Sequence, residues 1–298
     1  MKFKSILLCI FLTFSTLVFS QQTTLDKSIQ TITDGKKASV GISVTGIDFD
    51  FQYANDKAQT PLPLMSVFKF PIACAVYDLV DQGKLKIDQK IFVKKSDLLE
   101  NTYSPIQKKY PHGNVYLSLR EIIRYTVAES DNNGCDLLLR LIGGPEKVQK
   151  FLNSKRIKDI QILFNEEQMH QDPKLMYKNV ATTNAMNEIW KKFYQNQLIS
   201  KKSTKDLMNI LLSTSTGKNK LAEQLPKGSI AHKTGSSGKP FGDLTIAEND
   251  TGLVTLPNGK HYAITVFVSE STESDVENCK MISDISKTVY YYLSSEKP

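Results

Sequence analysis

Apolar residues recur every three or four positions in several stretches of the chain, a spacing that predicts amphipathic helices. In the stretch that begins at Ser66, for example, Phe68, Ile72 and Val76 fall on one face, and Gly83 marks the end. The other predicted helices are Gln21–Lys37, Leu117–Val127, Cys135–Ile142, Glu146–Asn153, Asn184–Gln195 and Ser283–Leu293.

Segments rich in Val, Ile and Phe, separated by turn residues, predict strands near both ends of the chain. Ala38–Phe51 is long enough for a strand pair, and Pro257-Asn258-Gly259 is a hairpin turn signal. The other predicted strands are Ile230–Thr234, Phe241–Ala247, Gly252–Leu256 and His261–Ser269.

One internal segment, Gln161–Asn179, is polar and has no period, so it predicts a long loop. Loops of that length inside a compact domain are usually functional or disordered.

The order of these elements predicts an α+β fold, an α/β sandwich in which terminal helices flank an antiparallel sheet. Both ends of the chain contribute strands to the sheet, and the helical middle forms an inserted all-helical lobe. We expect the α/β lobe to comprise residues 21–62 and 213–298, and the all-helical lobe residues 63–212.

The first twenty residues have the pattern of a signal peptide rather than of a folded element. Lys2 and Lys4 precede an apolar stretch, Ile6–Phe19, which is short for a membrane span. Val18 and Ser20 supply a small-residue cleavage pattern, so we expect a cut after Ser20 and export to the periplasm; an uncleaved anchor is the alternative. No later segment is apolar for long enough to predict a membrane span.

Composition excludes several kinds of function. The formal net charge of +7 falls by two, to +5, if Lys2 and Lys4 are removed, and no basic-aromatic cluster predicts nucleic-acid binding. Such a mild cationic excess favours small anionic substrates. The four histidines, His112, His170, His232 and His261, have no metal-ligand spacing, so we expect no metal.

Three cysteines follow the predicted cut, and an odd number rules out a complete disulfide framework. We expect Cys74 and Cys135 to be buried free thiols, with a single bridge between them as the alternative in an exported protein. Cys279 is the third.

Ser66 and Lys69 are candidates for nucleophilic chemistry because their spacing places both side chains on one helical face. A lysine amine can serve as the base for a serine, and a helix N-terminus offers N–H groups to a developing oxyanion. The spacing alone is weak evidence, since Ser215–Lys218, Ser236–Lys239 and Ser294–Lys297 match it as well.

Two further short motifs are equally weak alone. Ser130-Asp131-Asn132 precedes a predicted helix and consists of residue types that cap helices. Lys233-Thr234-Gly235 ends a predicted strand, where a glycine turn is ordinary.

Taken together and in this order, the three motifs resemble those of the serine β-lactamase and penicillin-binding-protein superfamily. Glu166, inside the predicted loop, resembles the loop glutamate of the class A β-lactamases, and it fits that position better than Glu167 does. The resemblance covers approximately Leu25 to Leu293 and implies a β-lactamase/transpeptidase-like fold without a cofactor.

The chain departs from the common class A pattern in the same loop. His170 stands where an Asn usually helps to hold the hydrolytic water. Phe164 and Asn179 stand where an Arg and an Asp commonly bridge the loop ends. These departures resemble the extended-spectrum branch that includes the PER, VEB and CfxA enzymes.

The resemblance implies a role for each matching residue. Ser66 would be the nucleophile, with Lys69, or Glu166 through a water, as its base; Ser130 would protonate the leaving nitrogen, and Glu166 would drive deacylation. The backbone N–H groups of Ser66 and Ser236 would form the oxyanion hole. The residues implied to contact the substrate are Tyr103, Asn132, His170, Lys233, Thr234, Gly235 and Ser236.

Lys220 lies near a position where related enzymes place an Arg for the substrate carboxylate. A lysine lacks the bidentate fork of an arginine, so we expect a solvated surface residue instead.

The implied function is a monomeric, exported β-lactamase that hydrolyses penicillins and cephalosporins. One alternative is a penicillin-binding DD-peptidase or transpeptidase, which uses the same motifs but lacks a deacylating acid. Another is a non-enzymatic β-lactam sensor, which normally needs a membrane segment. A serine esterase of another fold ranks last, because the chain has no Gly-x-Ser-x-Gly motif.

Overall fold

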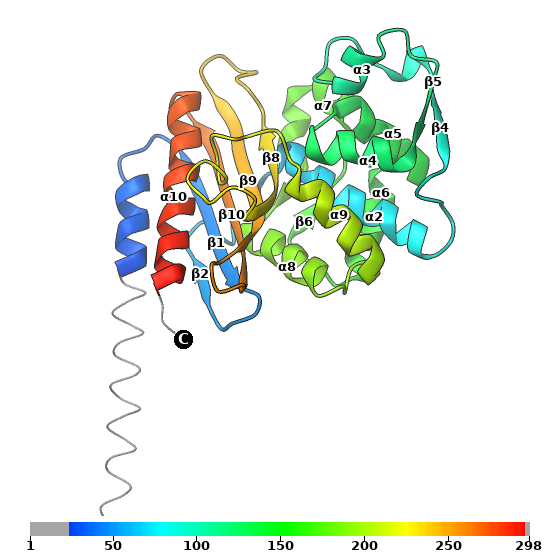
Figure 1. Cartoon of the computed structure of the whole chain (residues 1–298). Helices are drawn as coiled ribbons and strands as arrows, with labels where there is room; N and C mark the ends of the chain where they lie inside the picture. The colour runs from blue at the N-terminus through cyan, green and yellow to red at the C-terminus, as the bar shows by residue number, and fades with distance from the viewer. Residues whose placement is uncertain (1–23, 296–298) are drawn as a thin grey trace, which may run out of the picture.

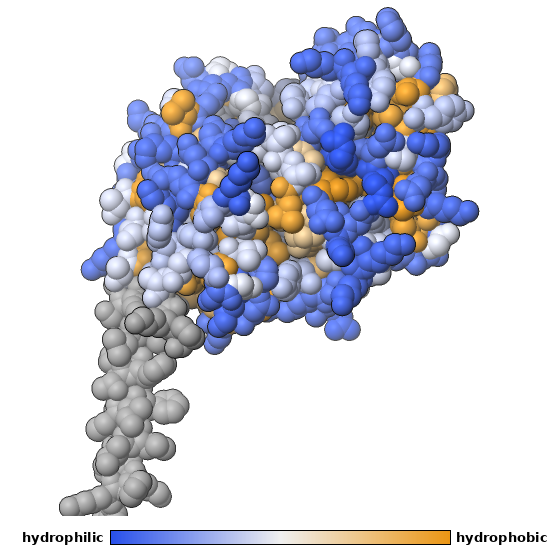
Figure 2. Space-filling model, in the orientation of Figure 1, coloured by the Kyte–Doolittle hydropathy of each residue, from blue (hydrophilic) through white to orange (hydrophobic). Residues whose placement is uncertain are grey.

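The structure is a computed structural model that describes residues 24–295. The predicted signal segment and the cut after Ser20 lie outside the described residues. Among residues 24–295, no helix is long and apolar enough to cross a membrane. Most of the face shown in Figure 2 is hydrophilic, with apolar residues in small separate patches.

A five-stranded antiparallel sheet is built from both ends of the chain, as predicted. Its order is β2 (Gln52–Ala54), β1 (Ser39–Gly46), β10 (His261–Ser271), β9 (Thr245–Thr255) and β8 (Ile230–Ser236). A helix over residues 24–33 and α10 (Asp275–Ser295) lie on one face of it (Figure 1). Alternate β10 residues, such as Ile264 and Val266, pack into the core beneath these helices.

The opposite face of the sheet packs against the helical part of the chain. α8 (Thr183–Tyr194) lies on β1 and β10, and α2 (Lys69–Asp81) is the central helix of this part. The rings of Phe70 in α2 and Trp190 in α8 stack at 4.2 Å, and the Trp190 Nε1–H donates to Thr251 Oγ1 of β9 at 2.8 Å. This chain of contacts fixes the helix that carries Lys69 to the sheet.

The remaining helices surround α2. α4 (Leu119–Ala128) and α5 (Asn132–Ile142) pack on it together with α6 (Pro145–Ser154) and α9 (Lys201–Leu212), while α3 (Pro105–Lys109) and η2 (Lys95–Asp97) lie further out. α9 was not predicted, because its first half is polar and only Leu207, Ile210 and Leu211 are buried apolar residues.

The segment predicted to be all-helical also contains two small sheets, which corrects that expectation. β4 (Lys90–Val93) pairs with β5 (Val115–Ser118). β7 (Val180–Ala181) lies between β3 (Leu62–Pro63) and β6 (Ile160–Gln161). These strands are too short to produce a visible alternation in the sequence.

Two of the predicted strands are one, which is a second correction. Phe241–Ala247 and Gly252–Leu256 were expected separately, but β9 runs without a break from Thr245 to Thr255. Three polar residues, Glu248, Asn249 and Asp250, interrupt the apolar pattern and are nevertheless buried. They tolerate burial because each has a polar partner in an adjacent segment.

The predicted loop Gln161–Asn179 contains a short helix, α7 (Glu166–Gln171), followed by a 3₁₀ helix, η3 (Pro173–Lys178). The side chain of Asn165 accepts from the Gln168 N–H, and the side chain of Gln168 accepts from the Asn165 N–H. This capping box is visible in the sequence as Asn-x-x-Gln and would have predicted the helix.

Candidate active site

Ser66 lies in a short 3₁₀ helix, η1 (Met65–Phe68), directly before α2. Met65 has a left-handed backbone with φ 48°, so the chain is strained immediately before this serine. The end of β8 lies against η1, and a Cβ on Gly235 would lie 2.8 Å from the Leu64 carbonyl oxygen and 3.2 Å from the Ser66 nitrogen. Glycine is therefore required at 235 for the strand to approach the serine.

The Lys69 amine is the centre of the site, and the side chain is fully buried. Its Nζ lies 2.9 Å from Ser66 Oγ, 2.8 Å from the Ser130 carbonyl oxygen and 2.8 Å from Glu166 Oε1. The fourth neighbour is Asn132 Oδ1 at 2.5 Å. A lysine ammonium carries three protons, fewer than these neighbours can accept. The structure thus brings the predicted catalytic residues Ser66, Ser130 and Glu166 together at the Lys69 nitrogen. Lys233 does not contact this nitrogen directly.

Ser130 links Lys69 to Lys233. It has a left-handed backbone with φ 59°, which directs its carbonyl to Lys69 while its Oγ accepts from Lys233 Nζ at 2.9 Å. Lys233 Nζ also donates to the Thr234 carbonyl oxygen at 2.8 Å. Burial first, and then the nearby Lys69 charge, lower the pKa of Lys233 well below its usual value. Lys233 therefore gives up a proton more readily than a surface lysine.

Asp131, the middle residue of its motif, is structural. Its buried carboxylate caps α5 by accepting from the Gly134 N–H at 2.7 Å, and it also accepts from the Ile106 N–H and the Ser104 hydroxyl. The helix cap predicted from the sequence is confirmed. It fixes the turn in which Ser130 and Asn132 flank the cap and face Lys69.

Glu166 begins α7, and its Oε1 lies 3.4 Å from Ser66 Oγ. The Asp136 carboxylate in α5 accepts both the Glu166 N–H, at 2.8 Å, and the Glu167 N–H, at 2.9 Å. Burial raises the pKa of Asp136 to about 6, although the two N–H donors offset part of that effect. The Glu167 side chain instead accepts from Gln171. The glutamate that faces the serine is therefore Glu166.

Asn179 closes the loop that carries Glu166. Its Oδ1 accepts from the Leu163 and Phe164 N–H groups at 2.8 and 3.0 Å, and its Nδ2 donates to the Phe164 carbonyl oxygen at 2.8 Å. Its own carbonyl accepts from the Leu64 N–H at 2.8 Å, two residues before Ser66. A buried amide thus joins the loop ends through the Phe164 backbone, at the place where an Arg–Asp pair joins them in the common class A pattern.

Ser66 lies where two cavities meet. A larger one of about 510 Å³ extends toward Thr234, Ser236 and Thr216, and a smaller one of about 210 Å³ is lined by Glu166 and His170. The exposed ring of Tyr103 and the Asn132 amide line both cavities. The Asn132 Nδ2 donates to Thr102 Oγ1 at 2.8 Å, so both ends of that amide are fixed.

The N–H of Ser236 faces away from β9, at the open edge of β8. In the β8–β9 ladder the Ser237 N–H donates to the Ala247 carbonyl oxygen, and adjacent residues of an antiparallel strand point their N–H groups in opposite directions. The Ser236 hydroxyl is already hydrogen-bonded within the protein, because it donates to Glu248 Oε2 at 2.7 Å.

Lys220 is buried, which corrects the expectation of a solvated surface residue. It forms an ion pair with Glu248, and its Nζ also donates to the carbonyl oxygens of Gly235 and Asn249 at 3.0 and 3.1 Å. Nothing in the local sequence of either residue indicates this pair, which joins positions on two separate segments.

The described cysteines, Cys74, Cys135 and Cys279, are all buried free thiols, as predicted for the first two. Burial raises the pKa of the Cys135 thiol well above its usual value, so it is not a thiolate nucleophile. Within residues 24–295, no three His, Cys, Asp or Glu side chains are grouped as metal ligands.

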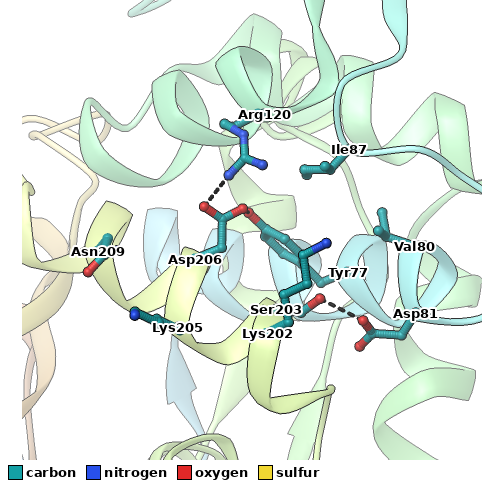
Figure 3. A pocket seen from close by; sticks show the side chains of 10 residues that line it. All are labelled: Tyr77, Val80, Asp81, Ile87, Arg120, Lys202, Ser203, Lys205, Asp206 and Asn209. Atoms are coloured by element: carbon teal, nitrogen blue, oxygen red, sulfur yellow. Dashed lines mark hydrogen bonds and ion pairs between the residues drawn. The ribbon is translucent and has the colours of Figure 1, made fainter.

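A separate cavity of about 430 Å³ lies between α2, α4 and α9 and contains none of the predicted site residues (Figure 3). The acids in it are already paired: Asp206 with Tyr77 and Arg120, and Asp81 with Ser203. The polar groups of this cavity link the three helices to each other.

Sequence reasoning missed several residues that shape the site. Thr216 places its hydroxyl 2.7 Å from that of Thr234, and Asn249 Nδ2 donates to the Pro63 and Leu64 carbonyl oxygens. Asp136, which accepts the Glu166 N–H, and Glu248, which accepts the Ser236 hydroxyl, were missed as well. Only a polar residue in an otherwise apolar stretch, as at Asp136, Glu248 and Asn249, could have pointed to them.

A serine beside a buried lysine, with a second serine and a carboxylate in reach, defines a serine acyl-transfer enzyme with an internal acid for hydrolysing its own ester. The model of the β-lactamase enzyme family matches residues 24–293. The chain belongs to this family, in the class A branch of serine enzymes that hydrolyse the β-lactam amide and confer resistance to these antibiotics.

Named relatives agree over nearly the full length. The chain is 45% identical to β-lactamase VEB-1 of Pseudomonas aeruginosa over 98% of each protein. It is 37% identical to extended-spectrum β-lactamase PER-1 of the same species, over 92% of this chain and 88% of that protein. The crystal structure of TLA-1 extended-spectrum β-lactamase superposes with a TM-score of 0.89 at 45% identity, covering 92% of this chain and 99% of that one. The predicted family, its PER/VEB-like branch and the fold are confirmed.

Replacing Asn179 by Ala should weaken the loop more than the rest of the fold. Two N–H groups and a carbonyl lose their partner, so we expect the free energy of unfolding in urea to fall by about 2–4 kcal/mol. Asn179→Asp, measured at a pH low enough to protonate its carboxyl, keeps the acceptor for both N–H groups and a donor for the Phe164 carbonyl oxygen, and should lose less. Equal losses in the two variants would contradict the role of Oδ1.

Asp136 should make stability depend on pH. Its folded-state pKa of about 6 lies above the unfolded value, so losing its proton between about pH 4 and pH 6 destabilises the folded state. Relative to Asp136→Asn, the wild-type free energy of unfolding should therefore fall by up to about 3 kcal/mol across this range. A difference that stays constant from pH 4 to pH 7 would rule out the raised pKa.

Proposed function

We propose that the chain hydrolyses penicillins and cephalosporins through an acyl-enzyme on Ser66. The observation that carries this proposal is the placement of Lys69 Nζ and Glu166 Oε1 at 2.9 and 3.4 Å from Ser66 Oγ. The first distance supports activation of the serine, and the second supports hydrolysis of the ester that the serine forms.

Acylation begins with attack of Ser66 Oγ on the lactam carbonyl. The serine proton passes to Lys69, or to Glu166 through a water. The backbone N–H groups of Ser66 and Ser236 stabilise the oxyanion, an interaction worth about 3–4 kcal/mol per donor elsewhere. Ser130 then relays the proton taken from Ser66 to the leaving nitrogen, while the nearby Lys69 and Lys233 tune it electrostatically.

Deacylation uses Glu166 as the base for a water that attacks the Ser66 ester. The water gives one proton to Glu166, its oxygen bonds to the carbonyl carbon, and Ser66 Oγ leaves and takes a proton back. The steps need only side chains and water.

The substrate would lie across both cavities. Lys233 and Thr234 would hold its carboxylate beside Gly235 and Ser236 at the end of β8, and the Asn132 amide would bond its acylamino group. Tyr103 and His170 would form the cleft walls. The His170 and Phe164 departures in the loop favour acceptance of cephalosporins.

We further propose export through the twenty-residue leader to the periplasm, where the protein acts as a monomer without nucleic-acid or membrane partners. The site would lie between an α/β lobe, residues 21–62 with 213–298, and the inserted lobe, residues 63–212. Glu166 favours the β-lactamase over a DD-peptidase or a sensor, because these need no deacylating acid.

The test is turnover of a chromogenic cephalosporin, followed by mass spectrometry of the enzyme. Wild type should turn over many equivalents, and Glu166→Gln should acylate but retain the adduct as a stable mass increase. Glu167→Gln, a matched change one residue away, should turn over normally. Stoichiometric acylation of the wild type without turnover would refute hydrolysis and favour a DD-peptidase or a sensor.

A further inference from the structure

A buried carboxylate lies in the part of the cleft where the substrate carboxylate is proposed to bind. Glu248 is in β9, directly opposite Ser236 of β8, and only 6% of its surface is exposed. It lines the same cavity as Ser66, Thr234 and Ser236. An acid at this place opposes anion binding by charge, so its presence needs an explanation.

The contacts of Glu248 occupy the polar groups around it. Its Oε2 accepts the Ser236 hydroxyl at 2.7 Å, and its Oε1 forms the ion pair with Lys220. The other Lys220 contacts are the carbonyl oxygens of Gly235 and Asn249. Three acceptors therefore match the three protons of the Lys220 ammonium.

Two groups that could bind an anion are thus committed to the protein's own carboxylate. The single Ser236 hydroxyl proton points to Glu248, and the Lys220 charge is balanced within the fold. Lys233 has no such partner: its neighbours are the Ser130 hydroxyl and a carbonyl oxygen. Lys233 therefore remains available to the substrate carboxylate. So does one of the Thr216 and Thr234 hydroxyl protons, because the other is used in the bond between these two hydroxyls.

We propose that Glu248 is a specificity-determining residue, an internal counter-ion that withholds Lys220 and the Ser236 hydroxyl from the substrate carboxylate. This inference rests on the proposed function, because it assumes that the carboxylate of the lactam binds beside Lys233 and Thr234. Glu248 sets how strongly that carboxylate is held and takes no part in the acyl transfer.

Glu248→Gln removes the charge and keeps the shape and an acceptor for the serine. For a cephalosporin with a free carboxylate, KM should fall roughly threefold to tenfold, while kcat changes by less than about twofold. The methyl ester of the same cephalosporin should show no change in KM, and added salt should shrink the effect on the acid. Glu223→Gln is the matched control, because Glu223 is an exposed acid and its change of net charge is the same.

A rival account is that Lys220 binds the substrate carboxylate itself. Lys220→Met should raise KM for the acid in either account. The double variant Lys220→Met with Glu248→Gln separates them, and replacing both partners of a buried pair is tolerated better than removing one. If Glu248 is a counter-ion, the double variant should return KM to within about threefold of wild type. If Lys220 binds substrate, KM should stay at the raised value, which would overturn the proposal.

Calorimetric binding on a Ser66→Ala background separates failure of this inference from failure of the proposed function. Binding of the intact acid and ester needs no turnover, so it reports on the carboxylate site directly. Tighter binding of the acid to the Glu248→Gln form supports the proposal. Equal affinities with and without Glu248→Gln overturn it, whether or not the wild type turns over lactams.

Discussion

The structure of the site depends on one buried amine. Lys69 has no exposed surface, and an unpaired charge at that depth would cost several kcal/mol. Its oxygen neighbours come from η1, from the start of α5 with the turn before it, and from α7, three segments far apart in the sequence. The amine contacts all three segments at once, so folding around Lys69 brings the nucleophile, the relay and the deacylating acid together.

The rest of the fold holds those three segments in place. The Asn179 side chain joins the two ends of the loop, and the Asp136 carboxylate accepts the N–H groups at the start of α7. These contacts hold the backbone that carries Glu166, and Lys69 holds its carboxylate. Asn249 holds the chain just before Ser66 from inside β9. Buried polar residues that weaken a strand in isolation therefore place the reacting groups.

Features that depend on residues close together in the sequence could be predicted from it. The helix cap at Asp131, the sheet from both chain ends and the motif residues followed from spacing and resemblance. The continuity of β9 did not, because the partners of Glu248 and Asp250, Lys220 and His232, are distant in sequence. The prediction that Lys220 is a solvated surface residue was wrong for the same reason. α7 was missed although its capping box was visible, since its six residues are too few to show a period.

Whether one amine serves both halves of the reaction can be measured by single-turnover kinetics of Lys69→Met. Rapid mixing with a chromogenic cephalosporin, read by absorbance and by the mass of quenched enzyme, gives the acylation and deacylation rate constants separately. Thermal unfolding confirms that the variant is folded. We predict that both rate constants fall by about 100-fold or more. Slow acylation with deacylation at the wild-type rate would contradict a role of this amine in both halves.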